Sequence, residues 1–165
     1  KPSKMVFTRK EVFESTYSRH PMKIDIKLGA DQDGTLRAID CYILSDTGAY
    51  GEHALTVFMV DGSKVIPLYN KLNAVSFYGD VVYTNHTHAG AFRGYGAIQG
   101  YFALESIVDM LCAKLKMDPI EFRQKNMMKE NETSPIFEIM GEGTAGTAMN
   151  MDTCKLEECV LTGME

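Results

Sequence analysis

Apolar and charged residues alternate in one early segment of the chain. Every second position from Met22 to Leu28 is apolar, and the positions between them carry Lys or Asp. This two-residue period predicts a strand with one buried face. The following Asp31-Gln32-Asp33-Gly34-Thr35 is a turn sequence in which Gly34 can take a positive φ. The apolar-rich segment Leu36–Ser45 then returns as the partner strand, so we expect an antiparallel hairpin.

Apolar residues three and four positions apart predict the longest helix, from Ala97 to Lys116. We expect this helix to cover a sheet and to bury four side chains: Tyr101, Phe102, Val108 and Leu111. Glu105 and Asp109 lie at the margin of the apolar stripe. There we expect a solvated edge or an ion pair rather than catalysis.

Helix-capping residues and prolines predict where the neighbouring helices begin and end. Asp118-Pro119-Ile120-Glu121 combines an N-cap, a proline at the first helical position and a glutamate at the third, which predicts a helix over Pro119–Met128. Residues 54–66 carry both helical spacing and strand-forming residues, and we assign them to a helix ended by Pro67. The alternating segment Leu72–Tyr83 is a further strand.

Composition changes after the predicted helices. Residues 129–151 are rich in Glu, Asn, Thr and Gly, including Gly141, Gly143 and Gly146, and predict a long polar loop. A last helix over Met151–Thr162, capped by Asp152 or Thr153, follows. The elements together predict an α+β fold in which helices cover a mixed sheet with an antiparallel hairpin. Because the sequence starts Lys1-Pro2-Ser3-Lys4, we expect residues 1–165 to be one partial domain of a longer chain.

Charge and hydropathy exclude two classes of function. The net charge of −5 gives no basic stripe, so we expect no nucleic-acid partner. No apolar run approaches the ~20 residues needed to span a bilayer, so we expect no membrane partner. The cysteines (Cys41, Cys112, Cys154 and Cys159) show no C-x-x-C pairing. Free thiols in a reducing, cytoplasmic location are therefore favoured, and Cys112 is expected to be buried; the roles of Cys154 and Cys159 stay open.

The most distinctive chemistry lies in the glycine-rich stretch 84–100. Small residues there surround one cation, Arg93, and two aromatic rings, Phe92 and Tyr95. If a helix starts near Gly96, its first N–H groups are free to hold an oxyanion, and Arg93 adds a planar fork of donors. The spacing G-x-G-x-x-x-G is one residue too long for a dinucleotide fingerprint. A tight loop whose glycines serve packing only, with Arg93 in a surface ion pair, is the alternative.

Four blocks of sequence resemble the molybdenum hydroxylases, the xanthine dehydrogenase and aldehyde oxidoreductase family. Residues 91–100, Ala-Phe-Arg-Gly-Tyr-Gly-Ala-Ile-Gln-Gly, are similar to the A-F-R-G-[FY]-G-x-x-Q-G signature, with Thr84-Asn85 ahead of it. Asp46-Thr47-Gly48-Ala49-Tyr50 resembles the D-x-G-A-Y element, and Arg19-His20-Pro21 the R-H-P near the start of the domain. Residues 118–126 match D-P-x-E-[FVL]-R-x-x-N.

The resemblance implies a role for each residue of the loop. Phe92, Arg93, Gly94 and Gly96 would contact molybdopterin or its dinucleotide form, chiefly through backbone amides. Tyr95 would line the substrate pocket, and Gln99 would support the loop. No catalytic residue is implied here, because the family's base is a glutamate near the end of the whole subunit. No direct metal ligand is implied either, because the pterin dithiolene holds the molybdenum.

The resemblance also implies a larger enzyme. It would hydroxylate an aldehyde or an N-heteroaromatic (xanthine- or purine-like) small molecule with water as the oxygen source. Its partners would be the remainder of the molybdenum subunit and subunits or domains carrying iron–sulfur clusters and FAD. No Arg occurs at 59–63, so purine specificity of the vertebrate type is not expected, and the fragment alone should be inactive. The alternative is a non-enzymatic α+β module that binds a phosphorylated ligand at Gly94–Gly100.

Overall fold

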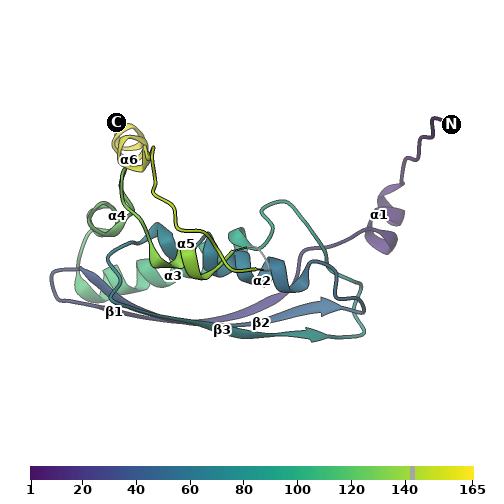
Figure 1. Cartoon of the computed structure of the whole chain (residues 1–165), viewed down its shortest axis with the longest axis horizontal. Coiled ribbons are helices and arrows are strands. Elements are labelled where there is room, and N and C mark those ends of the chain that lie inside the picture. The colour runs from purple at the N-terminus through teal and green to yellow at the C-terminus, as the bar shows by residue number, and fades with distance from the viewer. Residues whose placement is uncertain (142–143) are drawn as a thin grey trace.

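The computed structural model describes residues 1–141 and 144–165, and Gly143 of the predicted polar loop lies outside them. Helices and strands follow one another along the chain (Figure 1) in this order: α1 Arg9–Ser15, β1 Met22–Ala30, β2 Leu36–Gly48, α2 Ala54–Ser63, η1 Ile66–Leu68, β3 Ala74–Tyr83, α3 Ala97–Leu115, α4 Pro119–Asn126, α5 Pro135–Ile139 and α6 Leu156–Met164. The predicted α+β class is confirmed.

A three-stranded mixed sheet forms the base of the molecule, in the order β1-β2-β3. β1 and β2 are antiparallel, with Met22 opposite Ser45, which confirms the predicted hairpin. β3 runs parallel to β2, with Ala38 opposite Ala74. The parallel pairing requires a crossover, and the crossover carries α2 and η1. The helices α2, α3 and α5 lie on one side of the sheet, while α1 and the N-terminus project away from the rest (Figure 1).

The core lies between β2 and the helices. Alternate residues of β2, including Cys41 and Ile43, are buried against this layer. α3 contributes Leu104, Val108 and Cys112, each at most 2% exposed, so the predicted burial of Val108 and Cys112 is confirmed. α4 packs beside α3, as predicted.

The prediction that α3 buries Phe102 was wrong. Its side chain is 77% exposed, whereas Tyr101 and Leu111 are partly buried against the core. At 100° per residue, Phe102 lies about 200° around the helix from Leu104, which is buried in the core. An apolar stripe as wide as the one in this sequence does not reveal which of its edges faces the core.

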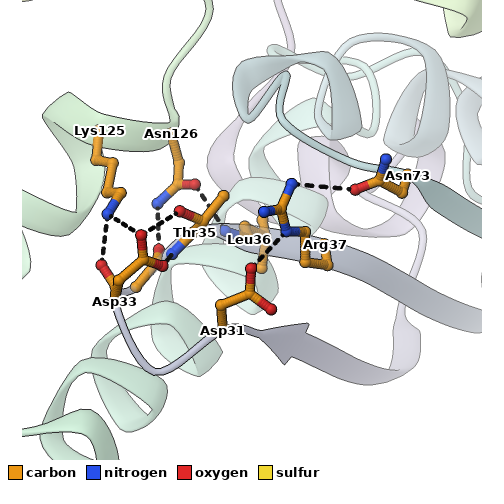
Figure 2. A network of polar contacts seen from close by, with 9 residues as sticks. Asp31, Asp33, Thr35, Leu36, Arg37, Asn73, Lys125 and Asn126 are labelled. Carbon is orange, nitrogen blue, oxygen red and sulfur yellow. Dashed lines mark hydrogen bonds and ion pairs between the residues drawn. The ribbon is translucent and has the colours of Figure 1, made fainter.

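The hairpin turn is locked by α4. Gly34 takes φ 80°, as predicted for the turn. The buried Asn126 side chain accepts a hydrogen bond from the Leu36 amide at 2.8 Å and donates to the carbonyls of Gly34 (2.8 Å) and Phe122 (2.9 Å). Figure 2 shows Asn126 beside Lys125, whose ammonium contacts an Asp33 carboxylate oxygen at 2.8 Å. Asn126, the last residue of the D-P-x-E-F-R-x-x-N block, therefore has a structural role, because it connects α4 to the hairpin turn.

Several element boundaries differ from the predictions. α2 ends at Ser63, and Pro67 lies inside the short helix η1 instead of ending the preceding one. α4 ends at Asn126 instead of Met128, although its Asp118 cap is confirmed. The final helix starts at Leu156 with Lys155 as its N-cap residue and no side-chain cap hydrogen bond.

Two short helices lie where none was predicted. The five-residue helix α5 interrupts the predicted polar loop 129–151, and Ser134 caps it by accepting from the Ile136 amide. α1 has a capping box between Thr8 and Glu11, a sequence signal that could have identified it. No helix in the described part of the chain is long and apolar enough to cross a membrane.

Candidate functional site

The loop before α3 reverses direction through three successive positive φ angles. Gly94 has φ 88°, Tyr95 49° and Gly96 103°. The Tyr95 amide donates to the Phe92 carbonyl at 2.7 Å, and the Ala97 amide donates to the Gly94 carbonyl at 2.9 Å. Glycine tolerates such angles at little cost, whereas tyrosine adopts them rarely. The conformation of the loop is therefore fixed by its own backbone hydrogen bonds.

The last two glycines of the signature serve the packing of α2 against α3. A Cβ atom on Gly96 would lie 2.3 Å from the Val57 carbonyl oxygen, and one on Gly100 would lie 2.9 Å from an Asp61 carboxylate oxygen. Both glycines are buried. Packing against α2 therefore requires glycine at these two positions, and the cofactor contact expected at Gly96 stays a prediction.

The first turn of α3 offers fewer free amides than the predicted anion site requires. The amides of Ala97, Gln99 and Gly100 are not free, because they donate to carbonyls within the loop, those of Gly94 and Gly96. Open donors also lie before the helix. Phe92, Arg93 and Gly94 are exposed, and within the described ranges their amides have no backbone acceptor.

Arg93 is the only cation of this loop. Its guanidinium forms no hydrogen bond or ion pair with any residue in the described part of the chain, so the predicted alternative of a surface ion pair is not what is observed. A guanidinium presents donors in a plane that matches phosphate and carboxylate groups. Together with the neighbouring open amides, it makes this edge of the molecule suited to an anionic group.

Arg19 and His20 connect the N-terminal segment to the loop. The Arg19 guanidinium lies 4.8 Å from the centre of the Phe92 ring and donates to the Gln99 side-chain oxygen at 3.4 Å. The Gln99 amide nitrogen donates in turn to the His20 carbonyl at 3.3 Å. Gln99 thus ties the start of α3 to the Arg19-His20-Pro21 block, consistent with its expected role as support for the loop.

Asp46 joins two further blocks of the sequence. Its carboxylate accepts from the Gly48 amide at 2.8 Å, from the Thr84 hydroxyl at 2.7 Å and contacts His86 Nδ1 at 2.6 Å. Burial by itself would raise the pKa of Asp46, but the hydrogen bonds from His86, Thr84 and the Gly48 amide hold the pKa below its usual value. The sequence motifs did not show this contact, which fixes the end of β2 to the start of the loop.

His53 is a residue that the sequence did not point to. Its Nδ1 lies 2.6 Å from the Tyr95 hydroxyl, and the two rings meet at 74° with 5.6 Å between their centres. His53 precedes α2 with a φ of 53°, so it also has a left-handed backbone. A helix start offers no sequence signal for a partner 42 residues later.

Asp61 is the second residue that the sequence did not reveal. It is 2% exposed on α2 and faces Gly96 and Gly100, and neither carboxylate oxygen has a hydrogen-bond partner within residues 1–141 and 144–165. Burial raises the pKa of Asp61 to about 8, although the nearby Gly100 amide partly opposes this shift. At neutral pH a protonated carboxyl therefore lies beneath the loop.

Metal ligation by side chains finds no support here. Within the described ranges no three His, Cys, Asp or Glu side chains are placed to hold a metal ion. His86 is paired with Asp46, and His88 lies edge-on to the Tyr17 and Tyr50 rings. On α3, Glu105 and Asp109 both contact Arg123, at 2.7 and 2.8 Å, so the predicted ion pair is confirmed.

Among the described residues, the loop thus exposes backbone donors without an acceptor and the Arg93 guanidinium without a partner, a donor set suited to an anionic group. Molybdopterin fits this donor set, because it can be held by hydrogen bonds without a side-chain ligand to the metal. The chain belongs to the molybdopterin cofactor-binding domain family, whose model matches residues 1–127. The prediction of the family, and of molybdopterin as its cofactor, is confirmed.

Three relatives illustrate the similarity. The xanthine dehydrogenase molybdenum-binding subunit of Escherichia coli O157:H7 is 39% identical over 135 residues, 82% of this chain and 18% of that protein. The nicotinate dehydrogenase large molybdopterin subunit of Eubacterium barkeri is 37% identical over 131 residues, 76% of this chain and 29% of that protein. The solved aldehyde oxidoreductase from Desulfovibrio gigas has a TM-score of 0.74 and 32% identity, covering 94% of this chain and 16% of its own.

The chain therefore spans less than a third of the length of each of these relatives. Family membership favours the molybdenum hydroxylase over the non-enzymatic module that was the alternative. The activity, substrate and partners of a whole enzyme do not follow from a segment of this size.

Proposed function

We propose that this chain is part of the molybdopterin-binding subunit of a hydroxylase that oxidises an aldehyde or an N-heteroaromatic substrate with water as the oxygen source. The observation that carries the proposal is the exposed edge of the loop, where Arg93 and the amides of Phe92 and Gly94 have no partner among the described residues. Relatives named for xanthine, nicotinate and aldehyde support this substrate range.

Each residue of the loop has a separate task in this proposal. Phe92, Arg93 and Gly94 hold the cofactor through hydrogen bonds, and the buried Gly96 lets α2 approach the loop from behind. Tyr95 contacts the substrate. When bound, the molybdenum cofactor supplies the redox chemistry, and these residues bind and orient. The catalytic base is expected elsewhere in the subunit, so the 165-residue chain alone should be inactive.

The surroundings of the chain are also part of the proposal. Residues 1–165 form part of one larger domain, in which the polar stretch 129–151 includes the short helix α5. The remainder of the molybdenum subunit completes the site, and iron–sulfur and flavin subunits or domains receive the electrons. The cytoplasmic location stays a prediction from the cysteine pattern.

Replacing Arg93 in the full-length enzyme tests the proposal. Arg93→Gln keeps the backbone and part of the side-chain volume but removes the charge. A hydrogen bond to a charged group is worth about 1.5–3 kcal/mol, so we expect cofactor affinity to fall by roughly ten- to a hundredfold. Molybdenum and pterin content per subunit would be measured after gel filtration, together with far-ultraviolet circular dichroism.

Arg37→Gln is the matched control. Arg37 is a partly exposed arginine at the hairpin end, where it contacts Asp31 at 2.7 Å (Figure 2). This variant should retain its full molybdenum content, because a surface ion pair of this kind contributes little. A folded Arg93→Gln enzyme with the same molybdenum content as the Arg37→Gln enzyme would refute the proposed cofactor contact.

A further inference from the structure

Two side chains from distant parts of the sequence meet at the candidate site. The Tyr95 hydroxyl lies 2.6 Å from Nδ1 of His53, which stands immediately before α2. Both residues have a left-handed backbone, with φ 49° at Tyr95 and 53° at His53. This conformation is uncommon for residues other than glycine. Two such residues in one hydrogen bond indicate that the surrounding structure fixes both ends of the contact.

The geometry of this contact leaves the faces of the Tyr95 ring uncovered by the imidazole. A hydrogen bond to Nδ1 lies in the plane of the imidazole ring. His53 therefore holds Tyr95 by its hydroxyl tip, and the angle of 74° between the rings excludes stacking of one on the other. Tyr95 is partly buried and His53 is exposed, so the pair lies at the surface of this chain.

A fixed aromatic ring favours one kind of substrate. A planar heteroaromatic molecule gains contact over a whole face when the ring it meets is already oriented, whereas a mobile ring must first lose rotational freedom. A small aliphatic aldehyde has no extended planar face, so it gains little contact from an aromatic ring that is already oriented. The hydrogen bond from Tyr95 to His53 thus bears on selectivity rather than on the chemical step.

We infer that His53 is a positioning residue, which orients the Tyr95 ring so that the site selects planar N-heteroaromatic substrates over aliphatic aldehydes. The inference rests on the proposed function, in which Tyr95 contacts the substrate. It adds a residue outside the glycine loop and chooses between the two substrate classes of that proposal. When the neutral histidine carries its ring hydrogen on Nε2, Nδ1 accepts a hydrogen bond from the Tyr95 hydroxyl.

Four variants of the full-length enzyme test the inference: His53→Ala, His53→Asn, Tyr95→Phe and the double variant His53→Ala with Tyr95→Phe. Asparagine tolerates the left-handed backbone and places its side-chain oxygen near the position of Nδ1, so it retains an acceptor for the Tyr95 hydroxyl. Molybdenum content, kcat and KM would be measured with xanthine, nicotinate and quinoline, and with acetaldehyde and butanal.

We expect His53→Ala and Tyr95→Phe each to raise KM for the heteroaromatic substrates by about two- to twelvefold, the range produced by loss of one hydrogen bond. For His53→Ala, the values of kcat, the molybdenum content and KM for the aldehydes should stay within about twofold of the wild type. In the double variant, KM for the heteroaromatic substrates should rise no more than in either single variant, because both substitutions remove the same hydrogen bond. His53→Asn should restore KM, which a purely structural role in folding would not produce.

Tyr42→Phe is the matched control, because Tyr42 donates a phenol hydrogen bond of 2.8 Å to Asp80 on the sheet. It should leave every constant unchanged. Three results would overturn the inference. They are a wild-type preference for the aliphatic aldehydes, additive increases in KM in the double variant, and equal increases in KM for both substrate classes. Wild-type enzyme without molybdenum would instead refute the proposed function itself.

Discussion

Replacing the buried Asp61 by asparagine should change how the stability of the chain depends on pH. The carboxyl group is 2% exposed and has no hydrogen-bond partner in the described part of the chain. Its pKa in the folded state is raised to about 8, mainly by burial, whereas an exposed aspartate in the unfolded chain titrates near 3.9. An asparagine side chain at this position would occupy nearly the same volume without a titratable proton.

The sign of the effect follows from the raised pKa. Between about pH 4 and pH 8 the folded chain keeps the Asp61 proton and the unfolded chain has lost it, so the free energy of unfolding falls as pH rises. Each pH unit in this window corresponds to ~1.4 kcal/mol, which amounts to a loss on the order of 4 kcal/mol by pH 7. Above about pH 8 the Asp61 contribution no longer changes.

Urea unfolding of both chains, followed by circular dichroism from pH 4 to pH 9, would measure this contribution. Other carboxylates titrate in both chains and cancel in the difference. We expect Asp61→Asn to be close to wild type at pH 4 and more stable than wild type by several kcal/mol at pH 8. A difference in stability that is the same at every pH would refute the assignment of a buried, protonated Asp61.

Three further predictions concern the Asn126 hydrogen bonds at the hairpin turn and the glycine-rich loop. Asn126→Asp places a carboxylate oxygen against the Gly34 and Phe122 carbonyls, so the free energy of unfolding, measured with urea, should fall by roughly 3 kcal/mol. Asn73→Asp, at an exposed site, is the control and should leave the free energy of unfolding unchanged. Gly96→Ala adds a Cβ 2.3 Å from a backbone oxygen and should lower the melting temperature; Gly163→Ala, with nothing within 4 Å, should not. In the full-length enzyme Tyr95→Ala should keep molybdenum and raise KM by about two- to twelvefold; loss of molybdenum would place Tyr95 on the cofactor instead.

The sequence by itself determined the elements whose causes are local. The alternation from Met22 to Leu28 and the turn at Gly34 specify the hairpin, because the two strands and the turn that joins them are adjacent in the sequence. The Asp118 cap fixed the start of α4 for the same reason. The motif around Arg93 likewise identified the family, since it consists of consecutive residues.

Tertiary structure alone decided the features that depend on partners far along the chain. The exposure of Phe102 depends on which edge of the α3 stripe meets the sheet, and helical spacing is the same for either edge. The contact between His53 and Tyr95 joins residues 42 positions apart. Asp61 is buried because Gly96 and Gly100 let α3 approach α2, and only that approach removes its carboxyl from water and raises its pKa.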